Sequence, residues 1–279
     1  MPASNDPAAL LHLITDLDTG NGMAKPNTAL ITGNSSGLGR GLTQTLLEAG
    51  WTVYGCSRRG YGETPAGLHD ARCDLSDLDA LPATLSALLE SAERLDLVIL
   101  NAGLLGEIRP VSETPLADMQ RLMDVNAWAN KVVLDWLKAW GRPVSQVVAI
   151  SSGAAVLGNK GWGGYALSKA ALNMLVRLYA HEFPDTHLSA LAPGLIDSAM
   201  MDYLCETPDP LEFPALQRIR DARGTERMPG PREAAARVIE VLPALRGEPS
   251  GEFVDIRKLL VPDEYEALMQ ARSRPATRP

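Results

Sequence analysis

Tyr165 and Lys169 are the two residues whose types and spacing most directly suggest chemistry. They stand four residues apart in a stretch, 164–173, whose alanines and leucines favour a helix, so both side chains should leave the same helical face. An ammonium held beside a phenol stabilises the phenolate and lowers a pKa that is ordinarily about 10. The pair therefore predicts a general acid or base. The alternative is an ordinary pair on a helix surface, because a lone Tyr-x-x-x-Lys is a weak motif.

The elements that would position this pair alternate along the chain from Asn27 onward. Apolar runs, most of them rich in Val, Ile and Leu, predict strands at 28–32, 52–56, 68–73, 97–101, 146–151, 188–192 and 252–256. Helical patterns lie between them at 38–49, 77–93, 115–140, 164–183 and 231–245. Most of the strands lack clean alternation, which is typical of strands covered on both faces. The pattern predicts an α/β fold: a single doubly wound Rossmann-type domain with a seven-stranded parallel sheet, whose ligands bind beyond the carboxyl ends of the strands.

Composition limits the classes of function. The 279 residues are 46% apolar and 22% charged, enough for a buried core. A net charge of -8 without a cluster of Lys and Arg argues against a nucleic-acid partner. We expect reduced thiols and no metal, because the cysteines and histidines show no ligand spacing. No apolar run reaches the roughly 20 residues that span a membrane, and no signal pattern opens the chain, so we expect a soluble cytoplasmic protein.

The first 26 residues differ from the rest of the chain. A short amphipathic piece at 8–17 is followed by a turn-forming run at 18–22 that leads to Pro26. We interpret 1–26 as a loosely held N-terminal extension and 27–279 as the domain. The extension could also cover a partner subunit.

A glycine-rich segment follows the first predicted strand and runs into a helix. Its glycines would let the backbone approach a pyrophosphate, and the helix N-terminus would supply free N–H groups and a positive dipole end. The position between a strand and a helix favours a dinucleotide-binding turn over an ordinary glycine turn. The residues expected to hold the cofactor there are Gly33, Ser35, Ser36, Gly37, Leu38 and Gly39.

The end of the second predicted strand bears on the choice of cofactor. NAD-binding folds usually place an acidic residue there, whereas this chain has Ser57, Arg58 and Arg59. Guanidinium groups suit the 2′-phosphate of NADP, so we expect NADP(H) rather than NAD(H). In the alternative, both arginines are solvated turn charges. After the third strand, Asp74, next to Leu75, could bind the adenine amino group, cap a helix, or do both.

From 27 to 257 the chain resembles a short-chain dehydrogenase/reductase. Thr32-Gly33-x-x-x-Gly37-x-Gly39 is similar to that family's cofactor turn, and Asn101-Ala102-Gly103 to its fourth-strand signature. Pro193-Gly194 with Ser198 resembles the family's Pro-Gly-x-x-x-Thr segment, serine keeping the hydroxyl of the commoner threonine. The resemblance implies that these residues, with Ile196, Tyr165 and Lys169, contact the cofactor.

The resemblance also implies a catalytic tetrad of Asn126, Ser152, Tyr165 and Lys169. In it Ser152 would donate to a substrate carbonyl, and Tyr165 would supply the proton as hydride arrives. By the same resemblance, Lys169 would hold the nicotinamide ribose and Asn126 would keep a water in a proton relay to the lysine. Two alternatives stay open: Ser151 could replace Ser152, which the spacing to Tyr165 favours, and Asn126 could be a helix-surface amide.

Four segments narrow the resemblance to the branch that contains sepiapterin reductase and bacterial benzil reductase: 150–155, 161–165, 192–200 and 251–257. Those enzymes reduce ketones flanked by a second carbonyl. In sepiapterin reductases an aspartate near the position of Asp255 anchors the pterin, which implies a substrate contact here. A residue that merely closes the sheet is an equal alternative for Asp255.

The substrate side is expected over 199–228, where the family places a mobile flap. The apolar and aromatic content of this stretch, including Met200 and Tyr203, suits a flat hydrophobic carbonyl compound. A self-packed helical lid is the alternative. Trp162, between glycines, is expected to form an aromatic wall. The remaining tryptophans at helical spacing indicate packing or a subunit contact: Trp128, Trp136 and Trp140.

Together these features predict an NADPH-dependent carbonyl reductase that transfers hydride to a ketone or diketone. One alternative is an NAD-dependent alcohol or hydroxysteroid dehydrogenase of the same fold. Another is a non-catalytic dinucleotide-sensing protein, against which the intact tetrad speaks. The family's usual association surface lies on the long helices around Asn126 and Tyr165, which implies a homodimer or homotetramer.

Overall fold

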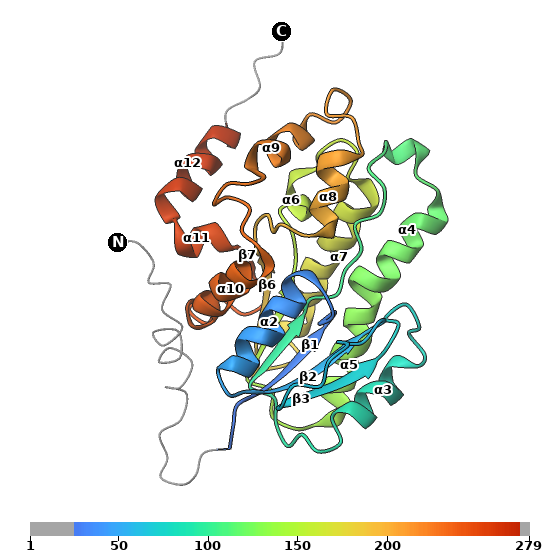
Figure 1. The fold of residues 1–279 in the computed structure, drawn as a ribbon, viewed down its shortest axis with the longest axis vertical. Helices are drawn as coiled ribbons and strands as arrows, with labels where there is room; N and C mark the ends of the chain where they lie inside the picture. Colours follow the sequence, from blue (N-terminus) through green and yellow to red (C-terminus); the bar gives the residue numbers. More distant parts are fainter. Residues whose placement is uncertain (1–24, 274–279) are drawn as a thin grey trace.

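The computed structural model describes residues 25–273, so the predicted extension 1–26 lies outside the described residues apart from its last two. Within the described range, seven strands pair in parallel in the order β3-β2-β1-β4-β5-β6-β7 (Figure 1). The strands are β1 (Thr28–Thr32), β2 (Thr52–Ser57), β3 (Leu68–Arg72), β4 (Leu97–Leu100), β5 (Gln146–Ile150), β6 (His187–Ala192) and β7 (Phe253–Asp255). The predicted seven-stranded parallel sheet is confirmed.

The strand order reverses beside β1, which pairs with β2 on one side and with β4 on the other. The chain moves outward from β1 through β2 to β3, returns to β4, and then moves outward in the opposite direction to β7. The connections that follow β1 and β4 therefore diverge. Such a reversal opens a crevice at the carboxyl ends of the strands, where doubly wound sheets bind their ligands.

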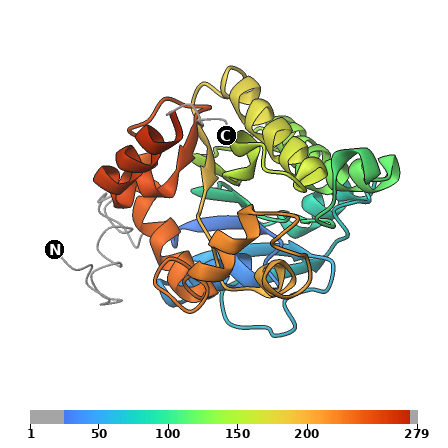
Figure 2. The same cartoon turned by 90° about the horizontal axis from the view of Figure 1, so that it is seen from above.

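Helices connect the strands and cover both faces of the sheet, as the view from above shows (Figure 2). Their bounds are α2 (Gly37–Glu48), α3 (Leu81–Leu88), the 3-10 turn η1 (Val111–Glu113), α4 (Leu116–Met123), the π-helical turn η2 (Asp124–Trp128), α5 (Ala129–Trp140), α6 (Ala154–Leu157), α7 (Gly163–Ala180), α8 (Ala199–Glu206), α9 (Ala215–Ala222), α10 (Pro231–Leu245), α11 (Ile256–Leu260) and α12 (Pro262–Ser273). None of the helices in the described part of the chain is long and apolar enough to cross a membrane.

Two predicted helices differ from those observed. The helix expected over 77–93 is shortened to α3, because Asp77 accepts a hydrogen bond from the N–H of Ala80 and holds a turn ahead of it. The helix expected over 115–140 is divided into α4, η2 and α5. A π turn such as η2 accommodates an inserted residue in a helix, and such turns often occur at functional sites.

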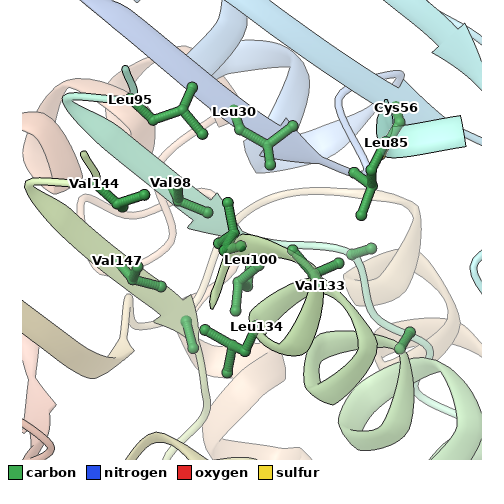
Figure 3. Close-up of a cluster of buried hydrophobic side chains, with 14 of the residues drawn as sticks. Leu30, Cys56, Leu85, Leu95, Val98, Leu100, Val133, Leu134, Val144 and Val147 are labelled. Carbon is green, nitrogen blue, oxygen red and sulfur yellow. The ribbon is translucent and has the colours of Figure 1, made fainter. Parts of the chain in front are cut away.

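Successive strand residues point to opposite faces, so each strand contributes to two cores. On one face, Leu30 and Leu100 pack with Leu134 of α5 (Figure 3). Residues of α3 and α7 belong to the same buried cluster. On the other face Ile31 and Ile99 pack in a second cluster with α2 and α10. Each fully buried side chain of this kind contributes about 1.5–3 kcal/mol. The two cores hold the strand ends rigidly in place.

Candidate active site

One cavity of about 1310 Å³ runs along the carboxyl ends of the strands. Its walls include residues that follow or end each strand, from Asp74 after β3 to Asp255 on β7. The predicted site residues that line it are Gly33, Ser35, Ser36, Gly37, Leu38, Ser57, Arg58, Asp74, Leu75, Asn101, Ala102, Gly103, Ser152, Trp162, Tyr165, Lys169, Pro193, Gly194, Ile196, Ser198, Met200 and Asp255. Three predicted residues are absent from this lining: Gly39, Asn126 and Tyr203.

The glycine turn lies against the segment that follows β4. Gly33 has a φ of +72°, and a Cβ built on it would stand 2.8 Å from the Cα of Ala102. Asn101 donates from Nδ2 to the carbonyls of Thr32 (3.0 Å) and Gly33 (3.2 Å), so its side chain braces the turn. Gly39 has a packing role, because its Cβ would meet the carbonyl oxygen of Gly33 at 2.2 Å. The turn can thus approach a ligand with bare backbone at the start of α2.

The cavity has polar and charged side chains where it reaches the end of β2. The buried hydroxyl of Ser57 has no hydrogen-bond partner among the described residues. Arg58 and Arg59 are exposed at the cavity wall. Arg121 on α4 also lines the cavity, a residue that nothing in the sequence marked for the site. These residues fit the adenosine end of a dinucleotide.

Asp74 holds a turn and does not cap a helix, because α3 begins only at Leu81. Its Oδ1 accepts hydrogen bonds from the hydroxyl (2.7 Å) and the N–H (3.0 Å) of Ser76. These bonds are the main reason that the pKa of Asp74 is lowered, with smaller contributions from Arg58 and Arg121. Asp74 nonetheless lines the cavity, so the turn holds a carboxylate at the adenosine end.

Tyr165 and Lys169 lie one turn apart on α7, and both are buried in the cavity wall. The Lys169 Nζ stands 5.9 Å from the centroid of the Tyr165 ring and donates to the carbonyl of Ile150 at 2.7 Å. Burial lowers the pKa of Lys169 to about 8. Gly103 makes room for the amine, because a Cβ there would stand 3.3 Å from Nζ.

The expectation that Lys169 lowers the pKa of Tyr165 is wrong for this structure. Burial raises the pKa of Tyr165 above its ordinary value, and a hydrogen bond with Ser152 opposes that rise. The amine is turned toward the Ile150 carbonyl, which accepts its hydrogen bond. Desolvation of the phenolate therefore exceeds the other influences, and the phenol stays protonated at neutral pH.

The two serines after β5 have different surroundings. Ser151 is buried and donates to Oδ1 of Asn173 at 2.5 Å. Ser152 is half-buried, accepts from the N–H of Ala154 at 3.1 Å, and hydrogen bonds with Tyr165. Only the Ser152 hydroxyl is thus joined to the phenol.

Asn126 is fully buried in the π-helical turn η2, so the interpretation as a helix-surface amide is wrong. Its Oδ1 accepts from the N–H of Leu104 (2.7 Å), and its Nδ2 donates to the Leu104 carbonyl (2.8 Å) and to Oγ of Ser168 (2.9 Å). Its own backbone carbonyl accepts from Nδ2 of Asn130 at 2.9 Å. Asn126 lies behind the cavity wall and joins the segment after β4 to α7.

Comparison with known proteins agrees with this geometry. Residues 27–209 match the family model described as short chain dehydrogenase. A benzil reductase ((S)-benzoin forming) of Saccharomyces cerevisiae is 30% identical over 245 residues, which cover 79% of this chain and 90% of the relative. A benzil reductase ((S)-benzoin forming) of Bacillus subtilis is 30% identical over 242 residues, which cover 83% of this chain and 98% of the relative. The chain belongs to the short-chain dehydrogenase family.

The fold of this short-chain dehydrogenase is also that of solved structures. The KRED1-Pglu enzyme superposes with a TM-score of 0.69 at 23% identity, covering 82% of this chain and all of the other. The protein is therefore an NAD(P)-dependent oxidoreductase. This follows from its family membership and agrees with the residues that line the cavity.

The segment 199–228, where a flap is expected, contains α8 and α9 with their connection. Met200 lines the cavity, whereas the Tyr203 hydroxyl accepts from the N–H of Ile108 at 3.0 Å and so contacts the segment after β4. Leu204 and Phe213 pack with Trp162 in one buried cluster. This segment therefore packs against the rest of the chain and also forms a wall of the cavity.

Two predicted substrate residues, Trp162 and Asp255, differ in whether their polar groups already have hydrogen-bond partners. Trp162 is buried beside Tyr165, with ring centroids 6.3 Å apart, and its indole N–H has no partner in the described part of the chain. Asp255 begins α11 and accepts from Arg257 at its N–H (3.1 Å), Nε (2.8 Å) and Nη2 (2.5 Å). The carboxylate thus lines the cavity while paired with its own helix.

Proposed function

We propose that this dehydrogenase is an NADPH-dependent reductase of ketones or 1,2-diketones that bear flat hydrophobic groups. The observation that carries the proposal is the hydrogen-bonded pair of Ser152 and Tyr165 on a cavity wall that also contains Lys169. The two benzil reductases support reduction of a carbonyl flanked by a second carbonyl. Trp162 and Met200 supply an apolar wall for such a substrate.

Each polar side chain has one task in the proposed reaction. NADPH, when bound, supplies the hydride that reaches the carbonyl carbon. Ser152 donates to the carbonyl oxygen, where negative charge develops, and Tyr165 gives that oxygen its proton. The raised pKa of Tyr165 keeps the phenol in its acid form at neutral pH, and burial raises the energy of the phenolate left behind. Lys169, with a pKa of about 8, is mostly an ammonium at pH 7, and its hydrogen bond to the Ile150 carbonyl holds it in the cavity wall beside Tyr165.

The remaining members of the site hold the cofactor and restore the proton. We propose that Lys169 also binds the nicotinamide ribose, and that Asn126 supports a water that relays protons to the lysine. The backbone of the glycine turn and of Pro193–Gly194 faces the cavity and would meet the pyrophosphate. Gly194 has a φ of +85° and open space where a Cβ would stand, so a ligand can approach it closely.

The preference for NADPH is supported by charges at the adenosine end. Ser57 ends β2, and Arg58 and Arg59 follow it, at the place where NAD-binding folds have an acidic residue. Initial rates with benzil should be at least about 10-fold higher with NADPH than with NADH at equal low concentration. Arg58→Ala should weaken NADPH binding and leave NADH binding little changed. Equal rates with both cofactors, or faster oxidation of an alcohol with NAD, would favour the alcohol dehydrogenase instead, and tight binding without any turnover would favour a sensor.

We also propose that the chain forms a homodimer or homotetramer through α7. Leu167, Met174 and Leu178 are 57%, 52% and 53% exposed and follow one side of that helix. Leu167→Glu should lower the molar mass measured by light scattering, whereas an unchanged mass would exclude this face.

A cytoplasmic location is part of the proposal, supported by the free, buried thiols of Cys56 and Cys73.

A further inference from the structure

Asp70 on β3 joins two segments at the adenosine end of the cavity. Its Oδ1 accepts a hydrogen bond from Nδ2 of Asn34 at 2.7 Å, and its Oδ2 accepts one from the backbone N–H of Tyr61 at 2.8 Å. Asn34 belongs to the glycine turn after β1, and Tyr61 belongs to the loop after β2. One carboxylate thus connects the turn that would meet the pyrophosphate with the loop that begins at Arg58.

A glycine opens the path for this connection. β2 lies between β1 and β3, so the Asn34 side chain must cross β2 to reach Asp70. It crosses at Gly55, where a built Cβ would stand 2.0 Å from Nδ2 of Asn34 and 3.2 Å from Oδ1 of Asp70. Glycine ordinarily weakens the interior of a strand, and here it permits the close approach of a side chain.

The loop after β2 turns against the same carboxylate. Gly60 has a φ of +71°, a conformation that favours glycine, and its built Cβ would stand 3.2 Å from Oδ2 of Asp70. Arg58 and Arg59 lie between two fixed residues: Ser57, which pairs within the sheet, and Tyr61, whose N–H donates to Asp70. Within residues 25–273 neither guanidinium forms a hydrogen bond or salt bridge, and Arg58 acts on Asp74 through its charge, which lowers the pKa of that carboxyl. Their reach is therefore set by the backbone to which they are attached.

The Asn34 amide is oriented by this contact. Because a carboxylate only accepts, the amide nitrogen must face Asp70, which leaves Oδ1 of Asn34 buried without a partner among the described residues. An unpaired buried oxygen is costly, and the charge-assisted bond to Asp70 offsets that cost. The hydrogen bond between Asn34 and Asp70 thus forms although Oδ1 of Asn34 is left without a partner.

From these contacts we infer that Asp70 is a positioning residue for cofactor selectivity. Acting through Asn34 and the Tyr61 backbone, it holds the loop of Arg58 and Arg59 against the glycine turn. It thereby places a guanidinium for the phosphate on the 2′ oxygen of the adenosine ribose. This inference rests on the proposed NADPH preference.

The test compares two fragments that differ by the 2′-phosphate, namely 2′,5′-ADP and 5′-AMP, by calorimetric titration of the full chain. Asp70→Ala should weaken 2′,5′-ADP by about 10-fold or more and 5′-AMP by less than about 3-fold. Gly55→Ala keeps Asp70 but displaces Asn34, and should give a loss in the same direction. Asn34→Ala removes one of the two links and serves if Asp70→Ala does not fold.

Asp96→Ala is the matched control. Asp96 Oδ2 accepts from the N–H (2.8 Å) and the hydroxyl (3.1 Å) of Thr28, at the amino ends of the strands. This variant should lose thermal stability without a change in the ratio of the two dissociation constants. If the wild type discriminates between the fragments and Asp70→Ala keeps that ratio, the positioning role alone is overturned. If the wild type binds both fragments equally, the proposed NADPH preference fails and this inference fails with it.

Discussion

The side chain of Asn126 forms two hydrogen bonds with the backbone of Leu104, one accepted by Oδ1 at 2.7 Å and one donated by Nδ2 at 2.8 Å. A third bond, from Nδ2 to Ser168, extends the connection to α7. Gly103, next to Leu104, stands where a Cβ would contact both the Asn126 Oδ1 (3.4 Å) and the Lys169 Nζ (3.3 Å). The buried amide therefore fixes the segment that packs against Lys169.

Asn126→Ala should lower the free energy of unfolding by about 2–4 kcal/mol, because it leaves the N–H and carbonyl of Leu104 unpaired. Urea unfolding measures that loss. Asn130→Ala is the matched control, because Asn130 is also buried and donates only one hydrogen bond, to the Asn126 carbonyl. A loss of stability no larger than that of the control would contradict the role given to Asn126.

Tyr165→Phe should reduce kcat of benzil reduction by about 10³-fold or more, because it removes the proton donor and little else. The dissociation constant of NADPH, from fluorescence titration, should change by less than about 3-fold. Tyr179→Phe makes the same change on the same helix, where the hydroxyl donates to Asp135 away from the cavity, and should keep full activity. Comparable turnover in the two variants would exclude Tyr165 as the acid.

Ser152→Ala should lower kcat about 10²-fold, because its hydroxyl is the donor placed for the developing oxyanion. Ser151→Ala should lower activity far less, since that hydroxyl is occupied by Asn173. Steady-state kinetics of both variants with one diketone decide between the serines. The reverse order of effects would reassign the donor to Ser151.

Lys169→Met should stabilise the fold in a pH-dependent way. The pKa of Lys169 is about 8 in the folded chain, below its ordinary 10.5, so burial of its charge costs stability below pH 8. That cost declines as pH rises from 8 to 10.5. The free energy of unfolding of the methionine variant should therefore exceed that of the wild type by about 1–3 kcal/mol at pH 7 and by less at pH 10. Its reductase activity should be lost.

Lys138→Met supplies the control for this pH dependence. Lys138 is about half exposed and pairs with Glu182 on the surface, so its removal should change stability by less than about 1 kcal/mol at either pH. Chemical unfolding at pH 7 and pH 10 compares the two variants. An equal gain for Lys169→Met at both pH values would show that no buried charge is relieved.

The order of the elements could be predicted from local pattern. The strand 28–32 and the helix 231–245 have the predicted bounds, because apolar runs and the Gly230-Pro231 start depend on neighbouring residues. The predicted helix 77–93 failed where Asp77 bonds to the Ala80 N–H, a competition that the periodicity does not register. The interruption of 115–140 at η2 was likewise not predicted, because helical residues flank this five-residue turn on both sides and the whole stretch was interpreted as one helix.

What the sequence by itself determined are relations within one element. The spacing of Tyr165 and Lys169 places both on one side of α7, and the glycines after β1 permit the bare turn, because helix geometry and glycine φ values are local properties. Only the tertiary structure decided how far Tyr165 is desolvated, that Tyr203 bonds to the Ile108 backbone, and that Asp70 reaches Asn34 across Gly55. These are contacts between segments distant in the chain, and burial arises only when such segments pack together.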